Sequence, residues 1–164
     1  MKKKIQKYLA GEREGFSLVE LIIVIAIMAI LIGVVTLAVL PNIAKSKESK
    51  DITALDSILS ATNNAVASRQ VATNGDFTAG ISSNKADISS ATPTGTDADK
   101  VRDEVVKLLG KNEIQFNSTP ACATGNQLKC SWTLTGGTIE IKVAIINGSN
   151  PVAGDYMGNF EVKN

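Results

Sequence analysis

Hydrophobic residues change their spacing along this chain of 164 residues, and the first pattern is an uninterrupted apolar run. It extends from Leu21 to Leu40, twenty residues in which only Gly33 and Thr36 are mild interruptions. As a helix rising about 1.5 Å per residue, the run is roughly 30 Å long, which matches the hydrocarbon core of a bilayer. The pattern therefore predicts a membrane-spanning helix.

After Pro41 the apolar residues recur at steps of three and four, which is typical of an amphipathic helix. We assign Ile52, Leu55, Ile58, Leu59, Thr62, Ala65 and Val66 to its apolar face, and Glu48, Lys50, Asp51, Asp56, Asn63, Asn64 and Arg69 to its polar face. We expect a nearly continuous helix over residues 16–72. Because proline lacks an N–H and clashes with the preceding turn, a kink is expected near residues 37–41. The second half is expected to cover a sheet; coiled-coil pairing is the alternative, but the apolar repeat lasts only about two heptads.

The middle of the chain is polar. Residues 73–80, TNGDFTAG, break the helical pattern, and the next twenty residues are rich in Ser, Thr, Asn, Asp and Ala. This composition favours a surface loop, with a glycan-bearing or partner-facing patch as the alternative. A capping start at residues 96–99 and a stop at Gly110 then predict a two-turn helix. Its apolar face is formed by Val101, Val105, Leu108 and Leu109.

The last third predicts an antiparallel sheet. Short strands are expected at 113–117 and 131–134, and longer alternating ones at 138–146 and 156–162. The last two form a hairpin with a long turn, whose inward residues are Ile139, Ile141, Val143 and Ile145, followed by Tyr156, Gly158, Phe160 and Val162. A helix laid across three or four such strands makes the fold class α+β.

Composition narrows the function. The chain has no histidine, which removes the usual general base and the commonest metal ligand, so we do not expect an enzyme or a cofactor. Basic and acidic residues are mixed beyond residue 15 and form no basic stripe, so nucleic-acid binding has little support. The first fifteen residues hold five basic and two acidic residues. This excess favours a cytoplasmic N-terminus by the positive-inside rule.

A cleaved secretory signal peptide is the first alternative to a retained span. Its apolar core would be about 7–15 residues long and would end in a small-residue cleavage site. Here the apolar run is longer, and it leads into Pro41 and the charged stretch KSKESKD. The sequence therefore favours a retained span.

Glu20 is a carboxylate at the start of this apolar run. Such a charge costs about 2.5–3.5 kcal/mol at the centre of a spanning helix and less near its end. The residue types alone leave two interpretations open. The carboxylate reaches the headgroups, or it has a function in the membrane.

The run Gly15-Phe16-Ser17-Leu18-Val19-Glu20, between a short basic leader and an apolar span, resembles the N-terminal signature of type IV pilins and related prepilin-like proteins. The resemblance covers residues 1 to about 44. It implies that a prepilin peptidase cuts after Gly15 and that the new amino group of Phe16 is methylated. It divides the chain into a cleaved leader (1–15), the transmembrane half of a long helix (16–44) and an extracellular α+β domain (45–164).

The residue types suit these roles. Gly15 has no β-carbon beside the scissile bond, so a protease can approach the extended backbone closely. The resemblance also implies that Glu20 acts in assembly, where its carboxylate neutralises the Phe16 amine of a neighbouring subunit within lipid. Pairing of Glu20 with its own Phe16 is the alternative, since positions i and i+4 share a helix face.

Two cysteines, Cys122 and Cys130, lie in the part expected outside the cell. A disulfide between them is the preferred interpretation, two reduced thiols are the alternative, and a metal site lacks further ligands. The chain departs from many members of the family in two ways. Leu37 stands where many have a proline within the span, and thirty-four residues follow Cys130, whereas many members close a large C-terminal loop with their disulfide.

These features predict a structural subunit of a type IV pilus, a homo-polymeric surface filament, held in the cytoplasmic membrane with its N-terminus inside before assembly. Its partners would be the peptidase and methyltransferase and the pilus assembly machinery. One alternative is a pseudopilin of a type II secretion or DNA-uptake system. Another is a membrane-anchored binding module that never polymerises. Roles in motility, adhesion or DNA uptake depend on partners encoded elsewhere.

Overall fold

The structure is a computed structural model, and it describes residues 16–155 and 158–164. The chain divides into two units at Pro41–Asn42, and each is described by itself. One long helix, α2 (Leu18–Arg69), contributes to both. It continues as a helix through Pro41, so the predicted long helix is confirmed. The described part of the first unit consists of the apolar end of this helix.

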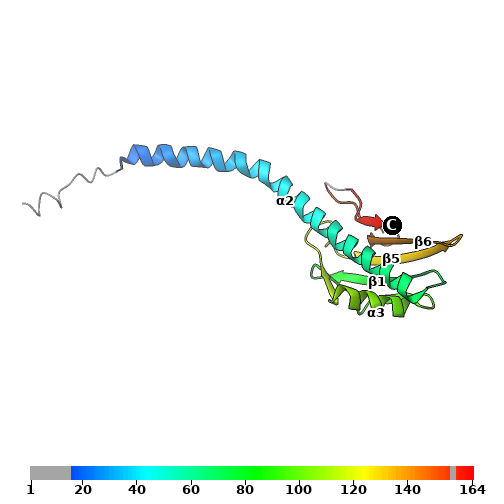
Figure 1. The fold of residues 1–164 in the computed structure, drawn as a ribbon. Coiled ribbons are helices and arrows are strands. Elements are labelled where there is room, and N and C mark those ends of the chain that lie inside the picture. Colours follow the sequence, from blue (N-terminus) through cyan, green and yellow to red (C-terminus); the bar gives the residue numbers. More distant parts are fainter. Residues whose placement is uncertain (1–15, 156–157) are drawn as a thin grey trace, which may run out of the picture. The chain divides into compact units, whose positions relative to one another are not determined.

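The second unit places the C-terminal part of α2 against an antiparallel sheet (Figure 1). Its strands are β1 (Gly75–Ser82), β2 (Lys85–Asp87), β3 (Thr92–Thr94), β4 (Glu113–Gln115), β5 (Gln127–Thr135), β6 (Thr138–Asn147), β7 (Asn150–Pro151) and β8 (Glu161–Lys163). The main order is β4-β2-β1-β5-β6-β7, with β3 also pairing with β1 and β8 with β6. A helix covering an antiparallel sheet is the predicted α+β class, in a pilin-like architecture.

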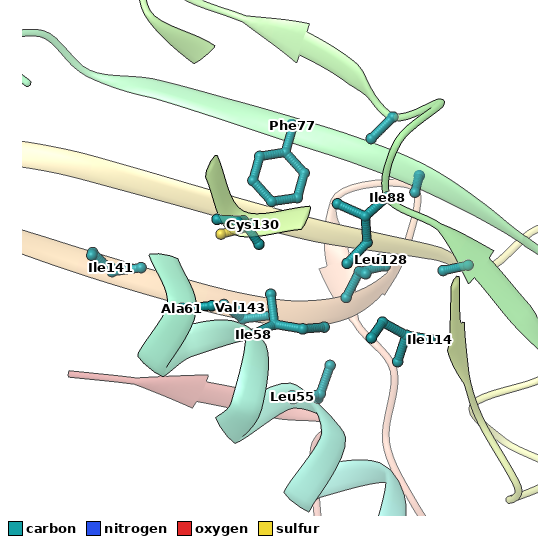
Figure 2. Packing of buried hydrophobic residues seen from close by; sticks show 14 of the residues in the cluster. Leu55, Ile58, Ala61, Phe77, Ile88, Ile114, Leu128, Cys130, Ile141 and Val143 are labelled. Atoms are coloured by element: carbon teal, nitrogen blue, oxygen red, sulfur yellow. The ribbon is translucent and has the colours of Figure 1, made fainter. Parts of the chain in front are cut away.

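The core lies between α2 and the sheet. Leu55, Ile58 and Ala61 of α2 point toward the strand residues Cys130 and Val143 (Figure 2). These two strand residues are register partners in the β5–β6 ladder. Each of the large apolar side chains is worth about 1.5–3 kcal/mol when fully buried. The amphipathic half of α2 therefore forms one wall of the core.

The segment predicted as a surface loop after residue 73 is instead part of the sheet. β1 pairs with β5 along six residues, from Gly75 opposite Trp132 to Gly80 opposite Gln127, and it also pairs with β2 and β3. Its glycines, aspartate and threonine hide the strand signal in the sequence. Because Phe77 and Ala79 both face the core, two apolar residues and ladder bonds on both sides hold a strand of low intrinsic propensity.

The predicted short helix is α3 (Ala98–Leu109), which is 12 residues long and packs against β1 and β3. Gly110 ends it in the left-handed conformation, and its N–H bonds to the carbonyls of Lys107 and Val106, as the stop signal predicts. The capping start is different, because the side chain of Asp97 makes no cap hydrogen bond. Val101 and Val105 are buried as predicted, whereas Leu108 is 48% exposed.

The C-terminal strands β6 and β8 pair antiparallel, as predicted for residues 138–146 and 156–162, but β6 has further partners. β6 forms a tight hairpin with β5, in which Thr135 lies opposite Thr138, and then pairs with the short strands β7 and β8. The predicted last strand is therefore reduced to residues 161–163. Ile141, Val143 and Ile145 are buried, and so is Phe160. Tyr156 lies outside the described residues.

Candidate functional site

The candidate site begins at the N-terminal end of α2, where three residues form a local hydrogen-bonded cap. The backbone N–H of Ser17 donates to the Glu20 carboxylate at 2.8 Å, and the N–H of Val19 donates to Ser17 Oγ at 3.3 Å. The Ser17 carbonyl accepts the first helical bond, from Leu21 N. This Ser-x-x-Glu arrangement is a variant of the capping box, in which the Ser17 hydroxyl accepts from the N–H of Val19 rather than from that of Glu20. It satisfies backbone donors that a helix beginning in an apolar setting would otherwise leave unpaired.

Phe16 lies directly before this cap and is 87% exposed. Gly15, the predicted cleavage position, lies outside the described residues. Glu20 is exposed, so its carboxylate lies on the helix surface next to Phe16 and Ser17 rather than in a pocket. The roles predicted for Gly15, Phe16 and Glu20 in processing and assembly therefore remain predictions. The geometry adds that Glu20 has a partner within its own chain.

The apolar part of α2 exposes every large hydrophobic side chain from Leu18 to Leu40 that the structure describes. Its most apolar window has a mean hydropathy of 3.2, and α2 is long and apolar enough to cross a membrane. Thr36, the polar residue within the run, donates its hydroxyl to the carbonyl of Ile32 at 2.7 Å. This bond satisfies the hydroxyl within the helix itself, as a position in lipid requires.

Two acidic residues that the sequence placed on the polar face of the amphipathic half, Glu48 and Asp51, are instead buried, with exposures of 1% and 0%. The Asp51 carboxylate accepts hydrogen bonds from the backbone N–H of Asn117 at 2.7 Å and of Ser118 at 2.8 Å. The Ser118 hydroxyl also donates to it, at 2.5 Å. Asp51 therefore fixes the loop after β4 to the helix.

Glu48 does the same for the loop between β7 and β8. Its carboxylate accepts the backbone N–H of Asp155 at 2.7 Å. The loop comes so close that a Cβ added at Gly154 would lie 2.7 Å from Glu48 Oε2, so a larger residue there would displace the Glu48 carboxylate. Helical spacing contained the missing signal, because Glu48 and Asp51 continue the stripe of Leu55, Ile58 and Thr62. Because both residues are charged, the sequence analysis assigned them to the polar face, and this assignment was wrong.

Both cysteines are free thiols in the structure. Cys130 lies on β5 in the core, where its sulfur is 3.2 Å from the hydroxyl of Thr62. Cys122 is half-buried in the loop after β4, and its backbone N–H bonds to the carbonyl of Ser118. Burial raises the pKa of the Cys130 thiol to about 12, and burial together with the charge of Asp51 raises that of Cys122. The predicted disulfide is not formed in the structure, and it remains a prediction.

Thiol labelling distinguishes the two states. From the free thiols of the structure we expect an alkylating reagent at about pH 8 to label Cys122 slowly in the folded protein and Cys130 only after unfolding, because thiolate is the reacting form. Peptide mass spectrometry reads each site. Failure to label either cysteine in denaturant until a reductant is added would instead establish the disulfide.

No group of three or more metal-ligating side chains occurs in the part of the chain that the structure describes.

Comparison with known families identifies a segment at the N-terminus. Residues 12–36 match the family described as the prokaryotic N-terminal methylation motif. No curated protein and no solved structure matches the chain significantly. The matched segment contains Gly15, Phe16 and Glu20, the capping box and most of the apolar run. The chain thus carries a type IV pilin-like prepilin signal, a substrate signal for a prepilin peptidase and for N-methylation, which includes the apolar start of a long helix and is followed in the sequence by a pilin-like α+β domain.

Proposed function

We propose that this protein is a structural subunit of a type IV pilus. It is cut after Gly15, methylated at Phe16, held in the cytoplasmic membrane by residues 16–44, and polymerised through α2 into a filament outside the cell. The observation that carries this proposal is the complete exposure of the apolar part of α2 directly after a methylation motif. An exposed apolar surface of this size needs lipid around it before assembly and other copies of the helix around it afterwards.

Glu20 supplies the register of assembly. In the single chain its carboxylate is satisfied by the Ser17 amide. Once the leader is removed, Phe16 carries a cationic amine at the same end of the helix. Exchange of the neutral Ser17 partner for a neighbour's amine would neutralise two charges in lipid, where leaving either unpaired is costly. A helix that stops one turn away from this position would leave both unpaired.

The domain beyond residue 44 provides the surface of the filament. Asp51 and Glu48 hold two of its loops against α2, so the helix and the sheet move as one piece within this unit. In the described residues the domain has a packed apolar core, and its buried acids Glu48 and Asp51 bind backbone groups of its loops, which suits a structural subunit.

A first experiment determines the intact mass and N-terminal sequence of the protein in material sheared from the cell surface. The proposal expects an abundant species that begins at Phe16 with one added methyl group. A species cut at the same bond that stays with the cell envelope would instead identify a pseudopilin of a secretion or DNA-uptake system. Retention of residues 1–15 in mature cells would refute both and leave a membrane-anchored binding module.

Gly15→Leu tests the processing step. The added side chain lies beside the scissile bond, so we expect cleavage to fall at least about tenfold, which corresponds to about 1.4 kcal/mol in the barrier. The measurement is the ratio of uncut to cut protein in membranes by immunoblot. Gly33→Leu is the matched control, because a Cβ at Gly33 meets nothing within 4 Å and the position lies within the apolar run. Normal cleavage of the Gly15 variant would contradict the proposed cut.

A further inference from the structure

Three lysines, Lys45, Lys47 and Lys50, lie on α2 soon after the apolar run, and all three are exposed. The ion pairs formed by the described residues include none of them. The other charged residues between positions 45 and 51 are Glu48 and Asp51, and both are buried. This short stretch therefore exposes positive charge alone, although its sequence alternates in sign. We call the three lysines the lysine collar.

The fold itself separates these charges. The carboxylate of Asp51 is directed to the backbone of Asn117 and Ser118, and that of Glu48 to the backbone of Asp155. On an isolated helix, acids at these positions would lie close enough to neutralise the lysines at i−3 and i−4. Here the neutralising groups are turned into the domain, so the lysine collar is available to an external anion.

The angular distribution of the lysine collar indicates what kind of anion it fits. At about 100° per residue, Lys47 lies about 200° and Lys50 about 140° around the helix from Lys45. A folded partner that docks on one face would meet one or two of these lysines. A layer that surrounds the helix would meet all three.

The position along the chain indicates the same partner. Lys45 follows Leu40, the last residue of the apolar run, by five residues, or about 7 Å of helix, and Lys50 by about 15 Å. The headgroup layer of a bilayer is about 5–8 Å thick on each side of the hydrocarbon core. With the reach of a lysine side chain, the first two lysines lie at the level of the headgroup phosphates and the third lies at their outer boundary.

Lys47 also borders a groove of about 430 Å³ that is lined by hydroxyl and amide groups. Its other lining residues include Asn84, Asn117, Thr119 and Thr124. Such donors suit a phosphate oxygen, and a neighbouring ammonium adds the charge.

We propose that the lysine collar binds the headgroup phosphates of anionic phospholipids, so that the globular unit rests on the surface of the membrane from which subunits are assembled. This inference rests on the proposed storage of the subunit in the membrane. It adds a lipid-binding surface to the domain, separate from the spanning helix. Each lysine near an anionic membrane surface is worth about 1 kcal/mol, or about fivefold in association.

The test uses the full chain in vesicles of phosphatidylcholine that contain a minority of phosphatidylglycerol. A trace of spin-labelled phosphatidylglycerol or phosphatidylcholine reports, by electron paramagnetic resonance, the lipids held at the protein. Where a lipid meets one lysine of the collar, we expect a preference of about fivefold for phosphatidylglycerol, weakened by high salt. The triple variant Lys45→Gln, Lys47→Gln, Lys50→Gln is expected to lose this contribution and to keep only the preference contributed by the five basic residues of the leader.

The matched control is Lys107→Gln, Lys111→Gln, Lys163→Gln, which removes the same charge from exposed positions elsewhere in the domain. It should keep the preference, and circular dichroism should show both variants folded. Undiminished preference in the collar variant would overturn the proposal. The proposal would also be overturned if the collar variant lost its filaments but kept the lipid preference. That result would indicate that the lysines contact acids of a neighbouring copy.

The lipid preference needs neither cleavage nor polymerisation, so it is measured independently of the proposed function. Glu20→Gln is expected to leave it unchanged. If the protein shows the lipid preference but never forms filaments, the pilus function is refuted and the proposal that the lysine collar binds anionic lipid stands.

Discussion

Glu20→Gln is expected to abolish filaments while leaving the processed subunit in the membrane. Glutamine can still accept the hydrogen bond from the Ser17 amide, so it preserves the capping box seen in the single chain and removes only the charge. Without the carboxylate, each arriving subunit brings an amine that stays unpaired in lipid, which costs several kcal/mol. We expect the sheared fraction to contain at least about tenfold less subunit, measured by quantitative immunoblot against the membrane pool.

Ser17→Ala is the control for this experiment. It removes the hydroxyl that accepts from Val19 N and keeps the charge of Glu20. Losing this cap should cost only about 1 kcal/mol of helix stability, so filaments should persist. Wild-type amounts of filament from Glu20→Gln would show that Glu20 serves the helix end alone. The same conclusion would follow if Ser17→Ala abolished filaments and Glu20→Gln did not.

Asp51→Ala is expected to cause a large loss of stability in the globular unit. The change leaves the backbone N–H and the hydroxyl of Ser118 without their acceptor in a buried site, and the backbone N–H of Asn117 without its acceptor in a partly buried one. Each buried unsatisfied donor costs about 1–3 kcal/mol, so we expect the free energy of unfolding to fall by about 3–4 kcal/mol. Urea unfolding of the full chain in detergent measures it, followed by the fluorescence of the buried Trp132.

Asp56→Ala provides the comparison, because Asp56 is an exposed acid on the same helix. Its removal should change stability by no more than about 0.5 kcal/mol. Hydrogen exchange should rise at residues 117 and 118 in the Asp51 variant and stay unchanged in the Asp56 variant. Equal stability of the two variants would contradict the anchoring role of Asp51.

The long helix was predictable because its signals are local. The apolar run, the helical spacing after Pro41 and the Gly110 stop each depend on neighbouring residues in the chain, and all three are found in the structure. The alternation in β6 was predictable for the same reason, since Ile141, Val143 and Ile145 on one face are buried and the other face, apart from Ala144, is not. The N-terminal signal was also local, and residues 12–36 match the methylation motif.

The structure of β1 was not predictable from its composition. Its residues become a central strand only because β5, about fifty residues later, supplies a ladder of six paired residues. The burial of Glu48 and Asp51 was not predicted for a similar reason. Their buried state is stabilised by backbone N–H groups at positions 117, 118 and 155, which the sequence cannot place beside the helix.

The sequence by itself determined the long apolar helix, the prepilin signal and the α+β class, because each follows from patterns that a short stretch of chain carries alone. Only the tertiary structure decided which acids are buried, which segments form the centre of the sheet, and hence that residues 45–51 of the helix expose three lysines and no acid of their own. These outcomes depend on contacts between residues far apart in the chain, where a hydrogen bond from a distant loop outweighs the preference of a charged side chain for water.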